Sequence, residues 1–192
     1  TLHDRAPEDA PHRPALCRML GWDVMRQGDW RRSIELFTEG LGLAERSGAE
    51  AEALLSRIGL SYALRSGREM ARAYAAVHPV PTHADRLGLH WIEVRAHMAL
   101  AGLVPGDGDL KQGIKHLRSA VDLARRGGDL RGEVAATVNL ATVLGTRAQH
   151  SDADILMEAA LVRIRRLGRG RLEAGGMSFA GLRYLRRGDV DL

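Results

Sequence analysis

The sequence predicts an all-helical protein made of repeated helical hairpins. Leu, Ala and Arg dominate the composition and aromatic residues make up only 4%, which favours helices over strands. Apolar residues recur at helical spacing and are interrupted by Gly-Asp breaks. The whole pattern then returns at intervals of about 40 residues, as expected of a repeat protein.

The first copy of the pattern runs from Leu20 to Gly40. Its first helix carries small and apolar residues up to the break at Gly28-Asp29. Glycine is favoured beyond a helix C-terminus because it adopts a left-handed conformation without a Cβ clash. A second helix follows, and these residues lie near its inward face: Ile34, Phe37, Leu41 and Leu43.

Matched small residues set the period of the repeat. Gly21 to Gly59 is 38 residues, Gly59 to Ala141 is 82 (two repeats), and Ala141 to Gly181 is 40. The third copy has a short insertion at 104–107, which leaves the register of its first helix open. We therefore expect an N-terminal segment at 1–13 and a repeat domain at 14–192, with repeats at about 14–48, 49–82, 83–128, 129–169 and a truncated 170–192.

The repeated positions have a consistent packing logic. Small residues let two helices approach closely, and large residues fill the gap between hairpins. Stacked hairpins then share one continuous core that a single hairpin could not form. The small set is Gly21, Ser33, Gly40, Ala141, Ala153 and Ala160, and the large set is Phe37, Leu117 and Met157.

The segment Gly28-Asp29-Trp30-x-x-Ser33-Ile34-x-x-Phe37 resembles the tetratricopeptide motif. This resemblance implies a right-handed α-solenoid of about four and a half repeats of 38–42 residues, longer than the usual 34. The long repeats are similar to those that follow the ATPase module of large bacterial transcription regulators of the LuxR and maltose-activator type. The joints at 123–133 and 166–171 carry this second resemblance.

The chain departs from such regulators in two respects. It contains no phosphate-binding loop of the G-x-x-x-x-G-K-[ST] type and no evident helix-turn-helix module. Because it begins at Thr1 and stops at Leu192 after a turn signal, we expect a fragment of a longer protein. It would be the regulator's sensing or assembly portion. The alternatives are a free-standing scaffold that joins partner proteins and, more distantly, an accessory domain of an enzyme.

Composition excludes several other classes. The single Cys17 rules out an internal disulfide framework and a cysteine-based zinc site, and its apolar neighbours favour a buried thiol. No apolar run is long enough for a membrane span and no signal peptide is visible, so we expect a cytoplasmic protein. The net charge of +4 comes from arginines interleaved with acids, which does not indicate direct nucleic-acid binding.

The resemblance implies that the first helices of the repeats line a concave surface that binds a protein, peptide or small molecule. The exposed positions there would be Arg18, Met19, Trp22, Met25 and Arg26, then Ser56, Arg57, Leu60 and Leu64, then Val138, Asn139 and Thr142. Trp22 is either an anchor in this groove or a packing residue against a neighbouring helix. Trp30 is expected to be structural and Trp91 to lie in the core.

His83, His90 and His97 recur every seven residues. On one helix they would share a face about 10.5 Å apart, too far for a zinc site of the i, i+4 kind. We expect these three histidines either to line a groove or to be plain surface or part-buried histidines, and of the three we assign His90 and His97 to the concave face. No catalytic residue is expected, because no serine or cysteine has a nucleophile context. No metal or cofactor is expected either. The truncated last repeat would expose an apolar face and favour a homodimer.

Overall fold

The computed structural model describes residues 12–103, 110–146 and 150–166. Every regular element in these residues is an α-helix, which confirms the expected all-α fold. The chain divides into two compact units, Thr1–His116 and Leu117–Leu192. Some sequence predictions fall outside the described residues, namely most of the 1–13 segment, the 104–107 insertion and the fifth repeat at 170–192.

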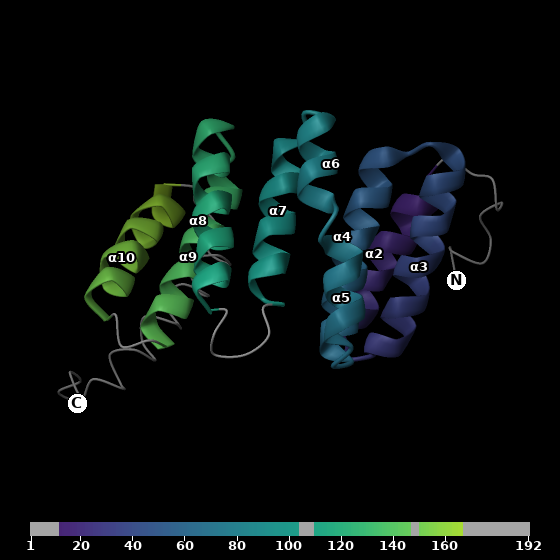
Figure 1. The fold of residues 1–192 in the computed structure, drawn as a ribbon, viewed down its shortest axis with the longest axis horizontal. Coiled ribbons are helices and arrows are strands. Elements are labelled where there is room, and N and C mark those ends of the chain that lie inside the picture. Colours follow the sequence, from purple (N-terminus) through teal and green to yellow (C-terminus); the bar gives the residue numbers. More distant parts are fainter. Residues whose placement is uncertain (1–11, 104–109, 147–149, 167–192) are drawn as a thin grey trace. The chain divides into compact units, whose positions relative to one another are not determined.

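Helical hairpins joined by short turns make up both units (Figure 1). The first unit holds α2 (Arg13–Arg26), α3 (Trp30–Ser47), α4 (Glu50–Ser66), α5 (Met70–Val77), α6 (Val80–Arg86), α7 (His90–Ala101) and the first turns of α8 (Leu110–Arg126). The second unit holds the rest of α8 with α9 (Leu130–Thr146) and α10 (His150–Arg166).

The turns repeat more regularly than the helices. Left-handed backbone occurs at positions 28, 48, 68, 88 and 128, at intervals of 20 residues or twice that. One helix with its turn thus occupies 20 residues and one hairpin 40. This spacing fixes the register that the sequence left open, because Gly88 starts the third repeat and α7 is its first helix.

Arg68, with φ of 64°, occupies the left-handed position where the other turns have glycine. The adjacent Gly67 has another function. A Cβ at Gly67 would lie 2.8 Å from ring atoms of Trp30, so its missing side chain lets the indole pack against the end of α4. Trp30 therefore has the structural role that its place in the motif predicts.

The second hairpin departs from the simple pattern because its second helix is broken. Pro79 has no amide hydrogen and cannot continue α5, but it caps α6, which also carries Pro81 in its first turn. The repeat boundary expected between residues 82 and 83 is thus wrong, since it falls inside α6. The second repeat extends to the turn at Gly88.

Phe37 of α3 is fully buried between the first helices of two successive repeats. A Cβ would lie 2.9 Å from its ring at Gly21 of α2 and 2.2 Å at Gly59 of α4. The Ser33 hydroxyl of α3 donates to the Gly21 carbonyl of α2 at 2.9 Å, so α2 and α3 are also joined by a buried hydrogen bond. These contacts confirm the predicted packing of small residues against a large one.

Helix α4 is the centre of the first unit and packs against α2, α3, α5, α6 and α7. Its contacts with the later helices form an apolar cluster that includes Leu54, Ile58, Val77 and Ile92. Because so many faces of α4 are covered, two positions expected on an exposed surface are in fact buried. They are Ser56, which is 0% exposed, and Leu64, which is 2% exposed.

Trp91 is the converse case, because it was expected in the core and is 40% exposed. Its neighbours Ile92, Val94 and Ala96 form the buried face of α7. Trp91 therefore points away from that face, and the Arg95 guanidinium lies 5.1 Å from the centre of its ring.

The second unit confirms the small and large positions of the fourth repeat. Ala141 of α9 is buried, and so are Ala153, Met157 and Ala160 of α10. The buried carboxylate of Glu133 on α9 lies 2.6 Å from Arg125 of α8 and 2.8 Å from Arg163 of α10. This ion triad joins three helices of the unit.

No helix in the described residues is long and apolar enough to span a membrane.

Cys17 is fully buried in α2, as its surroundings predict. Burial first, and then the nearby Glu39 carboxylate, raise the pKa of the Cys17 thiol to about 11. We therefore expect a disulfide reagent such as Ellman's reagent to modify the native chain at pH 8 at the rate of global unfolding, and the urea-unfolded chain at once. Equally fast reaction in both states would contradict this burial.

Candidate functional site

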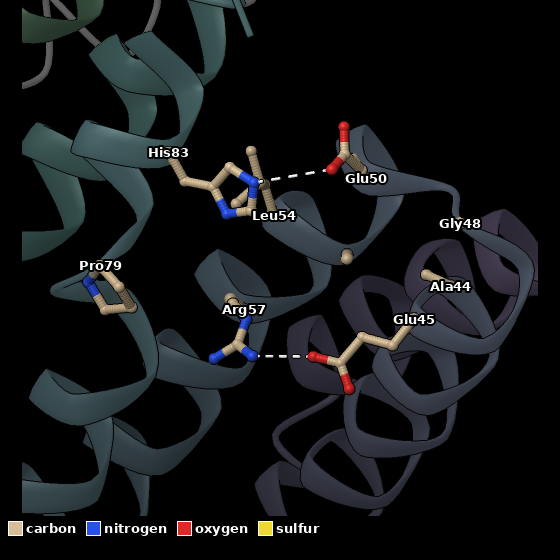
Figure 2. A pocket seen from close by; sticks show the side chains of 9 residues that line it. Ala44, Glu45, Gly48, Glu50, Leu54, Arg57, Pro79 and His83 are labelled. Carbon is tan, nitrogen blue, oxygen red and sulfur yellow. Dashed lines mark hydrogen bonds and ion pairs between the residues drawn. The ribbon is translucent and has the colours of Figure 1, made fainter. Parts of the chain in front are cut away.

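A pocket of about 350 Å³ opens between α3, α4 and α6 in the first unit (Figure 2). The apolar part of its lining, here called the floor, comes from Ala44, Ala53, Leu54 and Pro79. The volume is at the lower end of ligand sites, large enough for one apolar side chain of a partner but small for a cofactor.

Two acid–base pairs flank this floor (Figure 2). Arg57 of α4 donates to Glu45 of α3 at 2.8 Å. His83 reaches from α6 toward Glu50 of α4, with 3.8 Å between its Nε2 and a carboxylate oxygen. All four side chains are 33% to 56% exposed, so a bound molecule could reach donors and acceptors on two sides of the floor.

Local sequence explains how these residues meet. Gly48, with φ of 69°, ends α3 and folds the chain into α4, so that Glu45 and Glu50 lie at the same joint. The break at Pro79 redirects the chain between α5 and α6, and His83 follows one turn into α6. An unbroken helix in place of α5 and α6 would not change direction at Pro79. The pocket therefore depends on the break at Pro79.

Of the residues assigned to the concave face, Arg57 lines the pocket, and so does His83 from the series of spaced histidines. Arg18 of α2 instead forms a half-buried ion pair with Glu52 of α4, with 2.7 Å between Nε and the carboxylate. Arg18 and Arg57 thus both pair with acids of adjacent helices, and neither guanidinium is an open anion site.

Trp22 packs within an aromatic group, which favours the packing alternative for this residue. Its ring centre lies 5.4 Å from that of Phe37, edge to face, and 5.5 Å from that of Tyr62. The side chain is half-buried. Such aromatic pairs add about 0.5–1.5 kcal/mol each beyond area burial, so Trp22 contributes to the α2–α3–α4 packing.

The remaining predicted residues lie apart from one another. Met25 is half-buried, Arg26 is exposed and pairs with Asp23, and Leu60 packs against the apolar cluster around α4. Asn139 and Thr142 belong to the second unit, where Asn139 is exposed and the Thr142 hydroxyl donates to the Val138 carbonyl at 2.8 Å.

The three spaced histidines do not share one helix, as the sequence suggested, because the turn at Gly88 separates His83 from His90 and His97. Nδ1 of His97 lies 2.9 Å from Nδ1 of His116, so one ring donates to the other. Burial, and then His116, lower the pKa of His97 to about 4. Burial, followed by Lys115, lowers the pKa of His116 as well. Both rings are therefore neutral near pH 7.

Sequence reasoning missed most of the pocket, although one signal was present. Glu45, Gly48 and Glu50 cluster at a joint, which is how a turn between two helices gathers polar groups. The histidine series indicated that His83 could line a groove, but it did not indicate these neighbours, since the approach of His83 to them depends on the break before α6.

Comparisons with known proteins add evidence on the fold. No family model matches the chain, and no curated protein matches it either. Among solved structures, the chain is similar to a putative kinesin light chain of Podosopora anserina with nearly identical TPR-like repeats. The TM-score is 0.59 at 16% identity, over 86% of this chain and 82% of that one. The likeness establishes that this chain has a TPR-like helical-repeat fold.

Proposed function

We propose that the chain is a protein-interaction domain that captures one apolar side chain of a partner polypeptide in the α3–α4–α6 pocket. The observation that carries this proposal is the pocket's composition, an apolar floor between two exposed acid–base pairs. The TPR-like fold supports it, because helical repeats present surfaces of this kind to partners.

The chemistry of the pocket defines the class of partner. The floor of Ala53 and Leu54 gains free energy by covering an aliphatic or aromatic side chain. Glu45 and Arg57 together offer an acceptor and a donor, which suits the backbone amide and carbonyl groups that flank such a side chain. Because the Arg57–Glu45 pair joins one cation to one anion, that side of the rim carries no net charge, and we expect recognition of an apolar anchor and not of a strongly acidic or basic tail.

The test is selection of peptides from a random display library on the intact chain, followed by titration of the selected peptides. Ala53→Phe fills the pocket and should weaken binding at least about tenfold, equivalent to about 1.4 kcal/mol. Ala75→Phe is the matched control, because Ala75 is exposed on α5 and does not line the pocket. Its affinity should stay within about twofold of wild type.

A melting curve for each variant separates lost binding from lost folding. If Ala53→Phe is itself unfolded, the double variant Glu45→Arg with Arg57→Glu replaces it. These two substitutions keep an ion pair but exchange the positions of the acid and the base on the rim of the pocket. Peptides that bind the folded pocket variant, whichever of the two is used, as tightly as the wild type would show that the partner site lies elsewhere.

The regulator context is a separate part of our proposal and rests on the joint at 123–133. Much of the sequence of that joint is explained by the turn that it forms between two helices. Gly128 has φ of 67° and Asp129 accepts from the Gly132 amide at 2.9 Å, as Asp29 does from Arg32 after Gly28. Sequencing the gene on both sides tests it, because we expect an ATPase module before this segment and a DNA-binding module after it. A gene without either would leave the scaffold alternative.

A further inference from the structure

The joint between α6 and α7 brings three metal-binding side chains together. Gly88 turns the chain with φ of 68°, and its amide donates to the Asp85 carbonyl at 2.9 Å. The last turn of α6 thereby lies against the first turn of α7. One oxygen of Asp85, one ring nitrogen of His90 and one oxygen of Glu93 all lie within 4.8 Å of one another.

A second observation points to a ligand at this place. The Glu93 side chain is only 12% exposed, and its Oε2 is fully buried without a hydrogen-bond partner. Nδ1 of His90 is 3.7 Å from that oxygen, which is beyond hydrogen-bond distance. A buried carboxylate oxygen left in this state is costly, and native structures satisfy such atoms with a donor, a water or an ion.

We propose that Asp85, His90 and Glu93 bind a divalent transition-metal ion, with Zn²⁺ the best fit. Two carboxylates and one imidazole form a donor set that suits Zn²⁺, Mn²⁺ or Co²⁺, whereas Ca²⁺ requires more oxygen ligands. Ligand atoms around such an ion are about 3–3.5 Å apart. The side chains of Asp85 and His90 are exposed and can close that difference by small rotations.

His97 lies near the other carboxylate oxygen of Glu93. Its Nε2 lies 4.0 Å from Oε1 of Glu93, the oxygen that does not face His90, while its Nδ1 faces His116. At 4.0 Å this is not a hydrogen bond, so His97 is a neighbour of the proposed ligand and does not hold it in place. The exposed side of the site leaves room for water to complete the coordination.

The experiment is titration of the metal-stripped full chain with ZnCl₂ by calorimetry, and with CoCl₂ by visible absorption. We expect one ion per chain, a Co²⁺ spectrum typical of mixed nitrogen and oxygen ligands, and a higher melting temperature with Zn²⁺. His90→Gln and Asp85→Asn each remove one exposed ligand and should weaken binding about tenfold or more.

His83→Gln and Glu50→Gln are matched controls, because they remove a histidine and an acid of the pocket and leave the proposed ligands intact. Both should bind metal like the wild type. The proposal is overturned by the absence of binding to either ion, by unchanged affinity in His90→Gln and Asp85→Asn, or by an equal loss in the controls. Peptide binding in the pocket is measured separately, so failure of either proposal leaves the other standing.

Discussion

Replacement of Gly59 by alanine is expected to destabilise the first unit by about 1–3 kcal/mol. Alanine normally stabilises a helix interior relative to glycine by about 0.5–1 kcal/mol, so the sign of this change is diagnostic. The reason is that the new Cβ would lie 2.2 Å from the buried Phe37 ring, which is enclosed and has little room to move. Urea denaturation monitored by circular dichroism measures the effect.

Gly42→Ala is the matched control for this substitution. Gly42 also lies inside a helix, but its nearest neighbour is the far end of the exposed Arg46 side chain, at 3.3 Å. We expect Gly42→Ala to be neutral or to stabilise the chain by up to about 1 kcal/mol. Equal effects of the two substitutions would mean that α2, α3 and α4 do not meet around Phe37 as described.

Removal of both arginines that contact Glu133 is expected to destabilise the second unit by about 3–5 kcal/mol. The Glu133 side chain is 7% exposed, so Arg125→Met with Arg163→Met would leave a buried carboxylate without either cation. The carboxylate must then bind a proton or draw in water, and both responses cost stability.

Glu133→Gln is the informative comparison. It removes the charge that needs compensation, and the two arginines are 50% and 37% exposed and can return to water. The expected loss is therefore only about 1–2 kcal/mol. If Glu133→Gln costs as much as the double variant, the triad contributes through attraction to the arginines and not through the burial of Glu133. Thermal and urea unfolding of the three proteins decide the point.

The repeat architecture could be predicted from sequence because it depends on residue size. Gly21, Ser33 and Gly40 are small where helices approach, and Phe37 is large where a gap must be filled. These requirements act locally and recur, so they leave a readable pattern. The 20-residue spacing of the turns was less visible, because Arg68 replaces glycine at one of the left-handed positions.

The burial of individual positions was harder to predict, because it depends on how many neighbours a helix has. Ser56 and Leu64 were placed on an exposed face by analogy with the first repeat. Helix α2 packs against α3 and α4, whereas α4 packs against five described helices, so the same repeat position is less covered in α2 than in α4. Trp91 was misplaced because the buried face of α7 begins one residue later, at Ile92.

The candidate sites depend on breaks in the pattern and not on the pattern itself. The pocket needs the interruption at Pro79, and the metal-binding group needs the turn at Gly88 between Asp85 and His90. Treating the histidines as one seven-residue series hid the relevant spacing, which is His90 with Glu93, one turn apart on α7. The His90–Glu93 pair can be related to Asp85 only when the boundary between α6 and α7 is known.

A crystal structure of the chain with a selected peptide tests the proposed function most directly. We expect one apolar side chain of the peptide in the α3–α4–α6 pocket, in contact with Ala53 and Leu54, and peptide backbone groups bonded to Glu45 or Arg57. A peptide bound along α2 beside Trp22, with the pocket empty, would contradict the proposal and favour the groove that the repeat resemblance implied.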